Sequence, residues 1–211
     1  LVSPDILGVS SGAALGAVLA IFLSLPIFAI QGFAFVGGLV AVAMVYFIGN
    51  AVRGHDPILS LILTGVVVGT LLGSGLALMK YLADPYNQLP AITFWLLGSL
   101  SAISPADLWM AAPLMVLGMV PIFLLRWRMN VLSLSDDEAR ALGVNVGRLR
   151  LILVTCATLI TAAAVAISGI IGWIGLLIPH AARLMIGPEF ARMLPLRMLL
   201  GASYLLAVDT V

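Results

Sequence analysis

Residues 6–52 read ILGVSSGAALGAVLAIFLSLPIFAIQGFAFVGGLVAVAMVYFIGNAV and contain no Asp, Glu, Lys or Arg. The hydrocarbon core of a bilayer is about 30 Å thick and takes about 20 apolar residues per helix. The stretch is therefore too long for one membrane helix and has the length of two. A proline and a polar side chain interrupt it at Ser24-Leu25-Pro26 and Gln31-Gly32, so we expect the two helices to separate there.

The composition of the whole chain agrees with a membrane protein. Of its 211 residues, 63% are hydrophobic and 9% are charged, against about 45–50% and about 25% in an ordinary soluble domain, which excludes a soluble enzyme. The net charge of +1 argues against nucleic-acid binding. One cysteine, Cys156, excludes a disulfide framework and a thiolate metal cluster. Because Leu1 begins no signal peptide and the chain ends in an apolar run, we expect a fragment of a longer polytopic protein.

Five further membrane helices are expected after the first two. They cover 57–79, 108–125, 151–168, a shorter segment from about 173, and a segment from about 195. A short helix over 91–101, after Pro90, reads as half-buried or re-entrant. The predicted fold is an all-α, polytopic transmembrane bundle with about seven spans.

The basic residues predict the orientation of the bundle. With seven spans, nine of the ten cations fall on one side, and Lys80 lies alone on the other. The nine are Arg53, Arg126, Arg128, Arg140, Arg148, Arg150, Arg183, Arg192 and Arg197. Since Lys and Arg concentrate in cytoplasmic loops, the loop 126–150 is predicted to be cytoplasmic.

Small residues recur every four positions on two of the expected helices. The first repeat is Gly8, Gly12, Gly16 and Ala20, and the second is Gly65, Gly69, Gly73 and Ala77. Membrane helices associate by close backbone approach at such residues. The repeats therefore predict tightly crossing helices, and the sequence does not separate simple packing from a translocation wall that slides.

Candidate catalytic and metal-binding residues are few. Gly8-Val9-Ser10-Ser11-Gly12 matches the G-x-S-x-G pattern of serine hydrolases, with His180 as a conceivable base, but that pattern needs a strand–turn–helix and here opens a membrane helix. His55 and His180 have no second ligand at i+4, so neither predicts a zinc site. The absence of G-x-x-x-x-G-K-[ST] predicts that the chain has no ATPase activity of its own.

Asp209 is the one ionisable residue expected within a span, and its structural and functional readings stay open. An intramembrane carboxylate is what an ion-coupled secondary transporter needs. An ion-coupled secondary transporter is therefore an alternative function for the chain.

The loop 130–150 contains a well-specified short helix. Ser135 is placed as the N-cap and Glu138 at the third helical position, which is a capping box. Arg140 comes late and Gly143 stands where a glycine ends a helix. A helix of about two turns is marginal alone, so we expect it to dock against a soluble partner, with a solvated connector as the alternative.

Four motifs, in order, resemble those of the FecCD-type permeases, the membrane subunits of ATP-driven importers. The loop NVLSLSDDEARALGV (130–144) resembles the cytoplasmic loop of the family. SPDILGVSSGA (3–13), FWLLGSL (94–100) and GWIGLLIPHAARL (172–184) resemble its early, middle and late signatures. Trp173 stands where the family more often has Phe.

The resemblance implies a single permease domain over 1–211, with 130–150 as its coupling loop, taken from the middle of a subunit of about ten helices. It implies a bacterial cytoplasmic (inner) membrane protein that imports an iron-siderophore or a related chelate such as haem or cobalamin. The implied partners are a cytoplasmic ABC ATPase dimer, a second permease subunit, an extracytoplasmic binding protein and membrane lipid. No catalytic, cofactor or metal residue is implied, because ATP binds to the partner subunit.

The resemblance also assigns residues. The positions implied to couple to the ATPase are Ser135, Asp136, Glu138, Ala139, Arg140, Leu142 and Gly143. The positions implied for helix packing or the pathway are Gly8, Ser10, Ser11, Gly12, Gly16, Gly65, Gly69, Gly73, Trp95, Gly98, Pro179 and His180.

Overall fold

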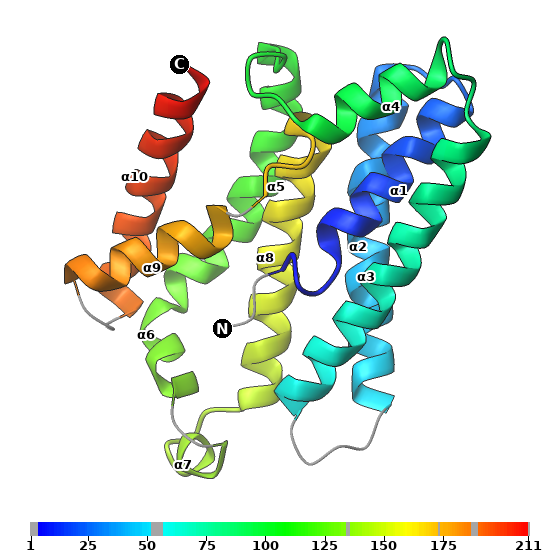
Figure 1. The fold of residues 1–211 in the computed structure, drawn as a ribbon. Helices are drawn as coiled ribbons and strands as arrows, with labels where there is room; N and C mark the ends of the chain where they lie inside the picture. The colour runs from blue at the N-terminus through cyan, green and yellow to red at the C-terminus, as the bar shows by residue number, and fades with distance from the viewer. Residues whose placement is uncertain (1–3, 52–56, 134–135, 173, 187–189, 211) are drawn as a thin grey trace. The chain divides into compact units, whose positions relative to one another are not determined.

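The fold is helical throughout the residues described by the computed structural model, which are 4–51, 57–133, 136–172, 174–186 and 190–210. The helices are α1 (Val9–Phe22), α2 (Ile27–Ala51), α3 (Pro57–Leu82), α4 (Gln88–Leu97), α5 (Pro105–Leu124), α6 (Arg126–Met129), the 3₁₀ turn η1 (Asn130–Ser133), α7 (Asp136–Ala141), α8 (Val146–Ser168), α9 (Ile174–Ile186) and α10 (Phe190–Asp209). Figure 1 shows them in chain order. The predicted all-α class is confirmed.

Each of the seven predicted membrane segments corresponds to a helix, and α2, α3, α5 and α8 are long and apolar enough to cross a bilayer. The helices α1 and α9 have 14 and 13 residues. At 1.5 Å per residue each is about 20 Å long, short of the bilayer core of about 30 Å. The 20 residues of α10 include Arg192, Arg197 and Asp209, which shorten its apolar length.

Two boundaries differ from the prediction around prolines. The interruption predicted at Ser24-Leu25-Pro26 is the turn between α1 and α2, where Ser24 has a φ of 53°, whereas the one predicted at Gln31-Gly32 lies inside α2. The short helix predicted over 91–101 is α4, which begins before Pro90 and ends before Gly98. Proline is tolerated in the first turn of a helix because the first N–H groups have no helical partner.

Two other helices start earlier than predicted because polar side chains cap them. α5 begins at Pro105 rather than 108, and α8 begins at Val146 rather than 151. The N–H of Arg148 donates to Oδ1 of Asn145 over 3.0 Å, which makes Asn145 the cap of α8. A cap sets a helix start several residues before the apolar run begins.

The chain divides into two compact units, and the boundary between them falls within α5 and α8. The first unit contains 1–115 and 158–171, and the second contains 116–157 and 172–211. Each unit has its own packed core.

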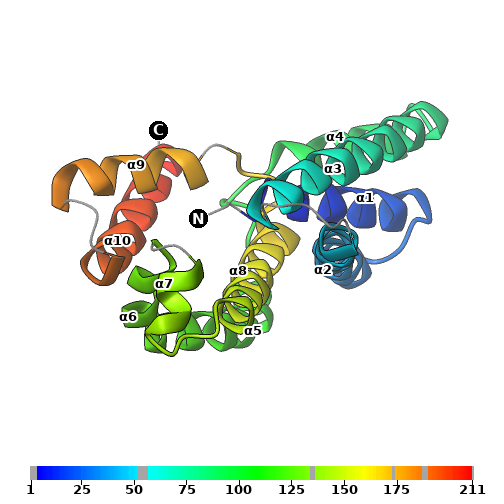
Figure 2. The ribbon, with the colours of Figure 1, turned by 90° about the horizontal axis from the view of Figure 1, so that it is seen from below.

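In the first unit, α1 lies between α2 on one side and α3 and α4 on the other (Figure 2). Its Val9, Ala13 and Ala17 are fully buried. A Cβ added at Gly12 would lie 2.4 Å from the carbonyl oxygen of Gly37, closer than real Cβ atoms come. The backbones of α1 and α2 are therefore in direct contact.

The glycine repeat of α3 contacts α1 and the turn before it over only part of its length. A Cβ at Gly65 would lie 2.3 Å from the carbonyl oxygen of Ile6, whereas one at Gly69 would lie 3.8 Å from Oγ of Ser11. Gly73 has no atom of the described chain within 4 Å of that position. The two repeats are alike in sequence but differ in what they contact.

In the second unit, a small core holds the connection between α5 and α8. Met129, Leu149 and Leu153 are buried, and Val144 and Leu194 pack against them. Separately, α9 packs across α10 (Figure 1). Each helix of that pair contains an internal proline, Pro179 and Pro195, respectively.

Candidate functional site

The short helix α7 is the first candidate site, and its C-terminal end is built to stop sharply. The N–H of Val144 donates to the carbonyl of Ala139 over 3.1 Å, and Gly143 between them has a φ of 77°. This bond and the left-handed glycine form a Schellman motif, in which the residue after the glycine bonds back across the last turn. Gly143 thus has the conformation that the sequence predicted.

The same turn anchors α7 on its inner side. Ala139 is 1% exposed, and Val144 packs against the core around Met129 and Leu149. Asn145 follows directly and caps α8. The short helix is therefore stabilised by its C-cap and by burial of one face, because its six residues are too few to be stable alone.

The outer side of the turn is open. Leu142 is 63% exposed, Glu138 is exposed, and a Cβ at Gly143 would meet no atom of the described residues within 4 Å. We call Glu138, Leu142 and Gly143 the ledge. An exposed leucine on a rigid, anchored turn is suited to contact with a protein.

Three predicted coupling positions lie wholly or partly outside the described residues. Ser135, predicted as the N-cap, lies outside the described residues, so the capping box stays a prediction. Asp136 and Arg140 belong to α7, and their side chains are outside the described part of the chain.

In α6, which precedes η1 and α7, the guanidinium of Arg126 stacks 4.2 Å from the ring centre of Phe123.

The second candidate region is the joint between α4 and the end of α8. A Cβ at Gly169 would lie 2.5 Å from the carbonyl of Trp95, and one at Gly98 would lie 2.7 Å from the carbonyl of Ile170. Both glycines have positive φ, 68° for Gly98 and 71° for Gly169. The N–H of Ser99 also donates to the carbonyl of Ser168 over 2.8 Å. Only glycine at both positions lets these two backbones meet in this conformation.

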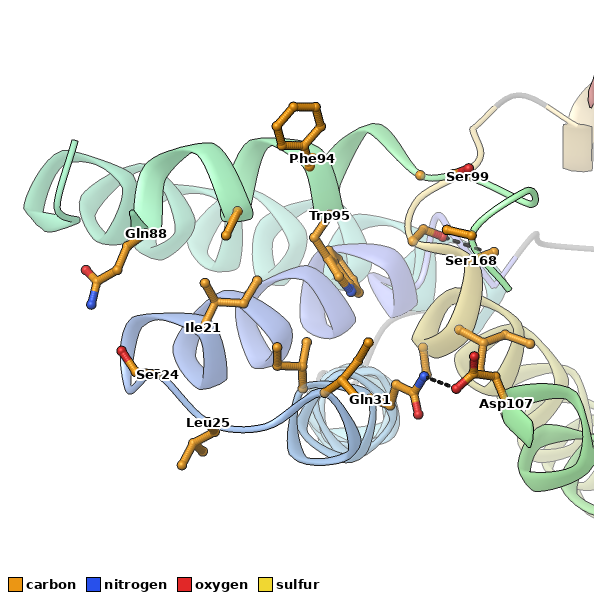
Figure 3. A pocket seen from close by; sticks show the side chains of 18 of the residues that line it. Ile21, Ser24, Leu25, Gln31, Gln88, Phe94, Trp95, Ser99, Asp107 and Ser168 are labelled. Carbon is orange, nitrogen blue, oxygen red and sulfur yellow. Dashed lines mark hydrogen bonds between the residues drawn. The ribbon is translucent and has the colours of Figure 1, made fainter. Parts of the chain in front are cut away.

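Beside this joint, a polar pair connects α2 to α5. Nε2 of Gln31 donates to Oδ1 of Asp107 over 2.7 Å (Figure 3). The other carboxylate oxygen of Asp107 accepts bonds from the N–H and hydroxyl of Ser104. Ser104 and Asp107 therefore form a capping box at the start of α5.

Ser10 and His180, the residues of the serine-hydrolase pattern, lie in different units of the chain. Ser10 lies in the first turn of α1, and its hydroxyl donates to Oδ1 of Asp5. The strand that the serine-hydrolase pattern requires is not found among the described residues before it. His180 is exposed on α9 beside Pro179, and the described residues hold no cluster of three His, Cys, Asp or Glu suited to a metal.

A model of the FecCD transport family matches the chain over residues 1–211. The chain belongs to the FecCD transport family. A relative from Helicobacter pylori named "Probable iron chelatin transport system permease protein" is 43% identical over 100% of this chain and 63% of its own length. The "Cobalamin import system permease protein" of Halobacterium salinarum is 40% identical over 100% of this chain and 57% of its own.

A solved structure of a metal-chelate type ABC transporter in an inward-facing conformation resembles this FecCD chain, with a TM-score of 0.91 and 37% identity. The match covers 99% of this chain and 67% of that one. The chain spans 63% and 57% of the lengths of the two curated relatives, less than two thirds of either.

Sequence reasoning missed two polar residues of this FecCD chain. Gln31 was assigned to a break between helices, and Asp107 was left one residue outside the predicted span 108–125. The spacing Ser104-x-x-Asp107 was the available signal, because a serine three residues before an acidic side chain and ahead of an apolar run marks a helix start. Nothing in the sequence indicated that Gln31 is the partner of Asp107.

Proposed function

We propose that the protein is a membrane permease subunit of an ATP-driven importer for a metal chelate, located in the bacterial cytoplasmic membrane. The observation that carries the proposal is the FecCD match over the whole chain, supported by the likeness to a metal-chelate type ABC transporter. The names of these relatives favour ATP-driven import over the ion-coupled alternative.

The substrate class is an iron-siderophore or a related chelate such as haem or cobalamin. Relatives named for an iron chelatin and for cobalamin are similar to this chain at nearly the same identity, 43% and 40%. Identity alone therefore favours neither substrate strongly. The permease performs no covalent chemistry, and a partner ATPase binds and hydrolyses ATP.

In this proposal the ledge contacts a cleft of the ATPase. Leu142 is 63% exposed while Ala139 is buried, so the turn is anchored on one side and presents the side chain of Leu142 on the other. A second permease subunit and an extracytoplasmic binding protein complete the transporter.

The test is capture of the ATPase by the full-length parent protein in detergent. Burying a leucine side chain contributes about 1.5–3 kcal/mol, so Leu142→Ala should weaken capture about tenfold or more and lower substrate-stimulated ATPase activity. Leu142→Pro removes the bond from its N–H to the carbonyl of Glu138, 3.2 Å long, and should abolish capture.

The matched control is Leu97→Ala. Leu97 is 70% exposed on α4, in a segment predicted to lie on the opposite side of the membrane, so the same truncation there should leave capture unchanged. Equal capture by all three variants and the parent would show that the ledge is not the docking site.

A further inference from the structure

A cavity of about 540 Å³ lies in the first unit, between the α1–α2 turn, α4, the start of α5 and the end of α8 (Figure 3). This volume lies within the range of small-molecule pockets, about 300–1,000 Å³. Its walls combine apolar side chains such as Leu25, Ile27 and Ile30 with hydroxyl and amide groups. Two of its lining residues, Trp95 and Gly98, are among the positions that the family resemblance implies for helix packing or the pathway, whereas the polar groups Gln31 and Asp107 are not.

The charge of the cavity wall is one-sided. Asp107 is the one carboxylate among the described residues that line it, and none of these residues is Lys, Arg or His. The partners of this carboxylate in the structure, Gln31 and Ser104, are neutral. A ligand that carries positive charge would therefore meet a complementary group here.

Gln31 supplies an unmatched acceptor beside that carboxylate. Its side chain lines the cavity, the residue is 8% exposed, and its Oε1 has no hydrogen-bond partner. Gln88, the other glutamine of the cavity wall, uses both ends of its amide: Nε2 donates to the carbonyl of Phe22, and Oε1 accepts from the N–H of Asp84. Buried polar groups are normally satisfied, so the amide of Gln31 lacks a donor.

A cation with several N–H donors would satisfy the carboxylate of Asp107 and, after a rotation of the amide that turns Nε2 away from Asp107, Oε1 of Gln31 as well. The terminal torsion of glutamine is broad and roughly two-fold, so a half-turn of the amide would bring Oε1 to the place of Nε2, now 2.7 Å from Oδ1 of Asp107. Two acceptors at that spacing repel each other unless a donor bridges them. An ammonium group carries three such donors.

An aromatic ring also lines the cavity. Trp95 points from α4 toward the α1–α2 side of the cavity in Figure 3, and Phe94 leaves α4 on the opposite side. The face of an indole attracts cations. We propose that this cavity binds a primary ammonium group on a short alkyl body, carried either by a free amine or by the headgroup of a phosphatidylethanolamine lipid.

The experiment measures binding of propylammonium chloride to the full-length parent protein in detergent by isothermal titration calorimetry. 1-Propanol is the neutral probe of the same shape, and sodium chloride controls ionic strength. Saturable binding of propylammonium is expected, at least about tenfold tighter than that of 1-propanol, because hydrogen bonds to charged groups are the strong ones. Equal binding of the two probes would overturn the proposal.

Two variants locate the site. Asp107→Asn removes the charge and keeps a side-chain oxygen that can accept the N–H of Ser104 at the start of α5. Gln31→Met removes the amide with little change in volume. Each should weaken propylammonium binding about tenfold or more. Asp5→Asn is the matched control, since Asp5 accepts a bond from the hydroxyl of Ser10 and neither residue lines the cavity. An equal loss in the control variant would contradict the proposal.

Lipid retention separates the two sources of the ammonium group. The parent and the Asp107→Asn variant are reconstituted in nanodiscs of equal parts phosphatidylethanolamine and phosphatidylglycerol, exchanged into detergent, and analysed for retained lipid by mass spectrometry. Selective retention of phosphatidylethanolamine that the variant loses identifies a lipid site. Calorimetric binding without such retention identifies a free-amine site, and the absence of both results overturns the proposal.

Discussion

A close backbone contact between α1 and α2 predicts that a single added methyl group affects stability. In Gly12→Ala the new Cβ would lie 2.4 Å from the carbonyl oxygen of Gly37 and 2.5 Å from Cβ of Ala41. Ordinary contact begins near 3.4 Å, so α1 and α2 must separate by roughly 1 Å. Overpacking of this kind costs about 1–3 kcal/mol.

A gain in helix propensity of about 1 kcal/mol for Ala over Gly opposes this loss. The net expectation for Gly12→Ala is a decrease of about 0–2 kcal/mol in the free energy of unfolding. Gly69→Ala is the matched control, because the nearest atom to its new Cβ would be Oγ of Ser11 at 3.8 Å. That variant keeps the propensity gain without overpacking, so it should be unchanged or more stable.

The assay is equilibrium unfolding of the full-length parent and both variants in mixed micelles, titrated with a denaturing detergent and followed by circular dichroism. The difference between the two variants should be about 2 kcal/mol, since it isolates the overpacking effect. Equal stabilities for Gly12→Ala and Gly69→Ala would refute the reasoning that backbone contact between α1 and α2 decides the stability of this unit.

Two further substitutions test the left-handed glycines. Gly143→Ala places a Cβ at a φ of 77° in open space, which should cost about 1–2 kcal/mol of local stability and weaken ATPase capture. Gly143→Asn should retain most of the ATPase capture. Full capture by the Ala variant would argue against the ledge as the docking site. Gly169→Ala adds backbone overlap to the same strain, because its Cβ would lie 2.5 Å from the carbonyl of Trp95. Its thermal stability in detergent should therefore fall more than that of Gly143→Ala, and a smaller loss would contradict the close contact at the joint.

The sequence predicted helices well where apolar length decides them, and poorly where side chains meet across the fold. Charge-free runs located α2, α3, α5 and α8, because a helix satisfies the backbone groups of an apolar segment in lipid within the segment itself. The apolar runs predict starts for α5 and α8 that are several residues too late, because each helix begins at a polar cap, Ser104 or Asn145, ahead of its apolar run. Local capping signals were sufficient to correct both.

Tertiary partners could not be predicted in this way. The repeats of α1 and α3 have the same spacing, yet a Cβ at Gly12 would overlap the backbone of α2, and one at Gly73 would meet no described atom outside its own stretch of helix within 4 Å. Similarly, the pairing of Gln31 with Asp107 joins residues 76 positions apart. A single sequence carries no signal for such contacts, because periodicity fixes which residues share a helix face but not which face lies opposite.

One physical device recurs at the candidate sites, and it explains why short segments of this chain are well defined. Gly143 ends α7, Gly98 ends α4 and Gly169 follows α8, each with a positive φ that other residues adopt only with strain. A helix that stops in this way turns its chain within one residue, and the neighbouring backbone can then contact a second element, as Gly98 and Gly169 do. At the ledge the corresponding space around Gly143 is open among the described residues. In the proposed transporter an ATPase contacts the ledge. A helix end at a glycine with positive φ then has two uses: it joins α4 to α8 within the chain, and at α7 it contacts a partner. Substitutions at Gly98 and Gly169 should therefore lower stability with or without the partner, and substitutions at Gly143 should lower capture more than stability.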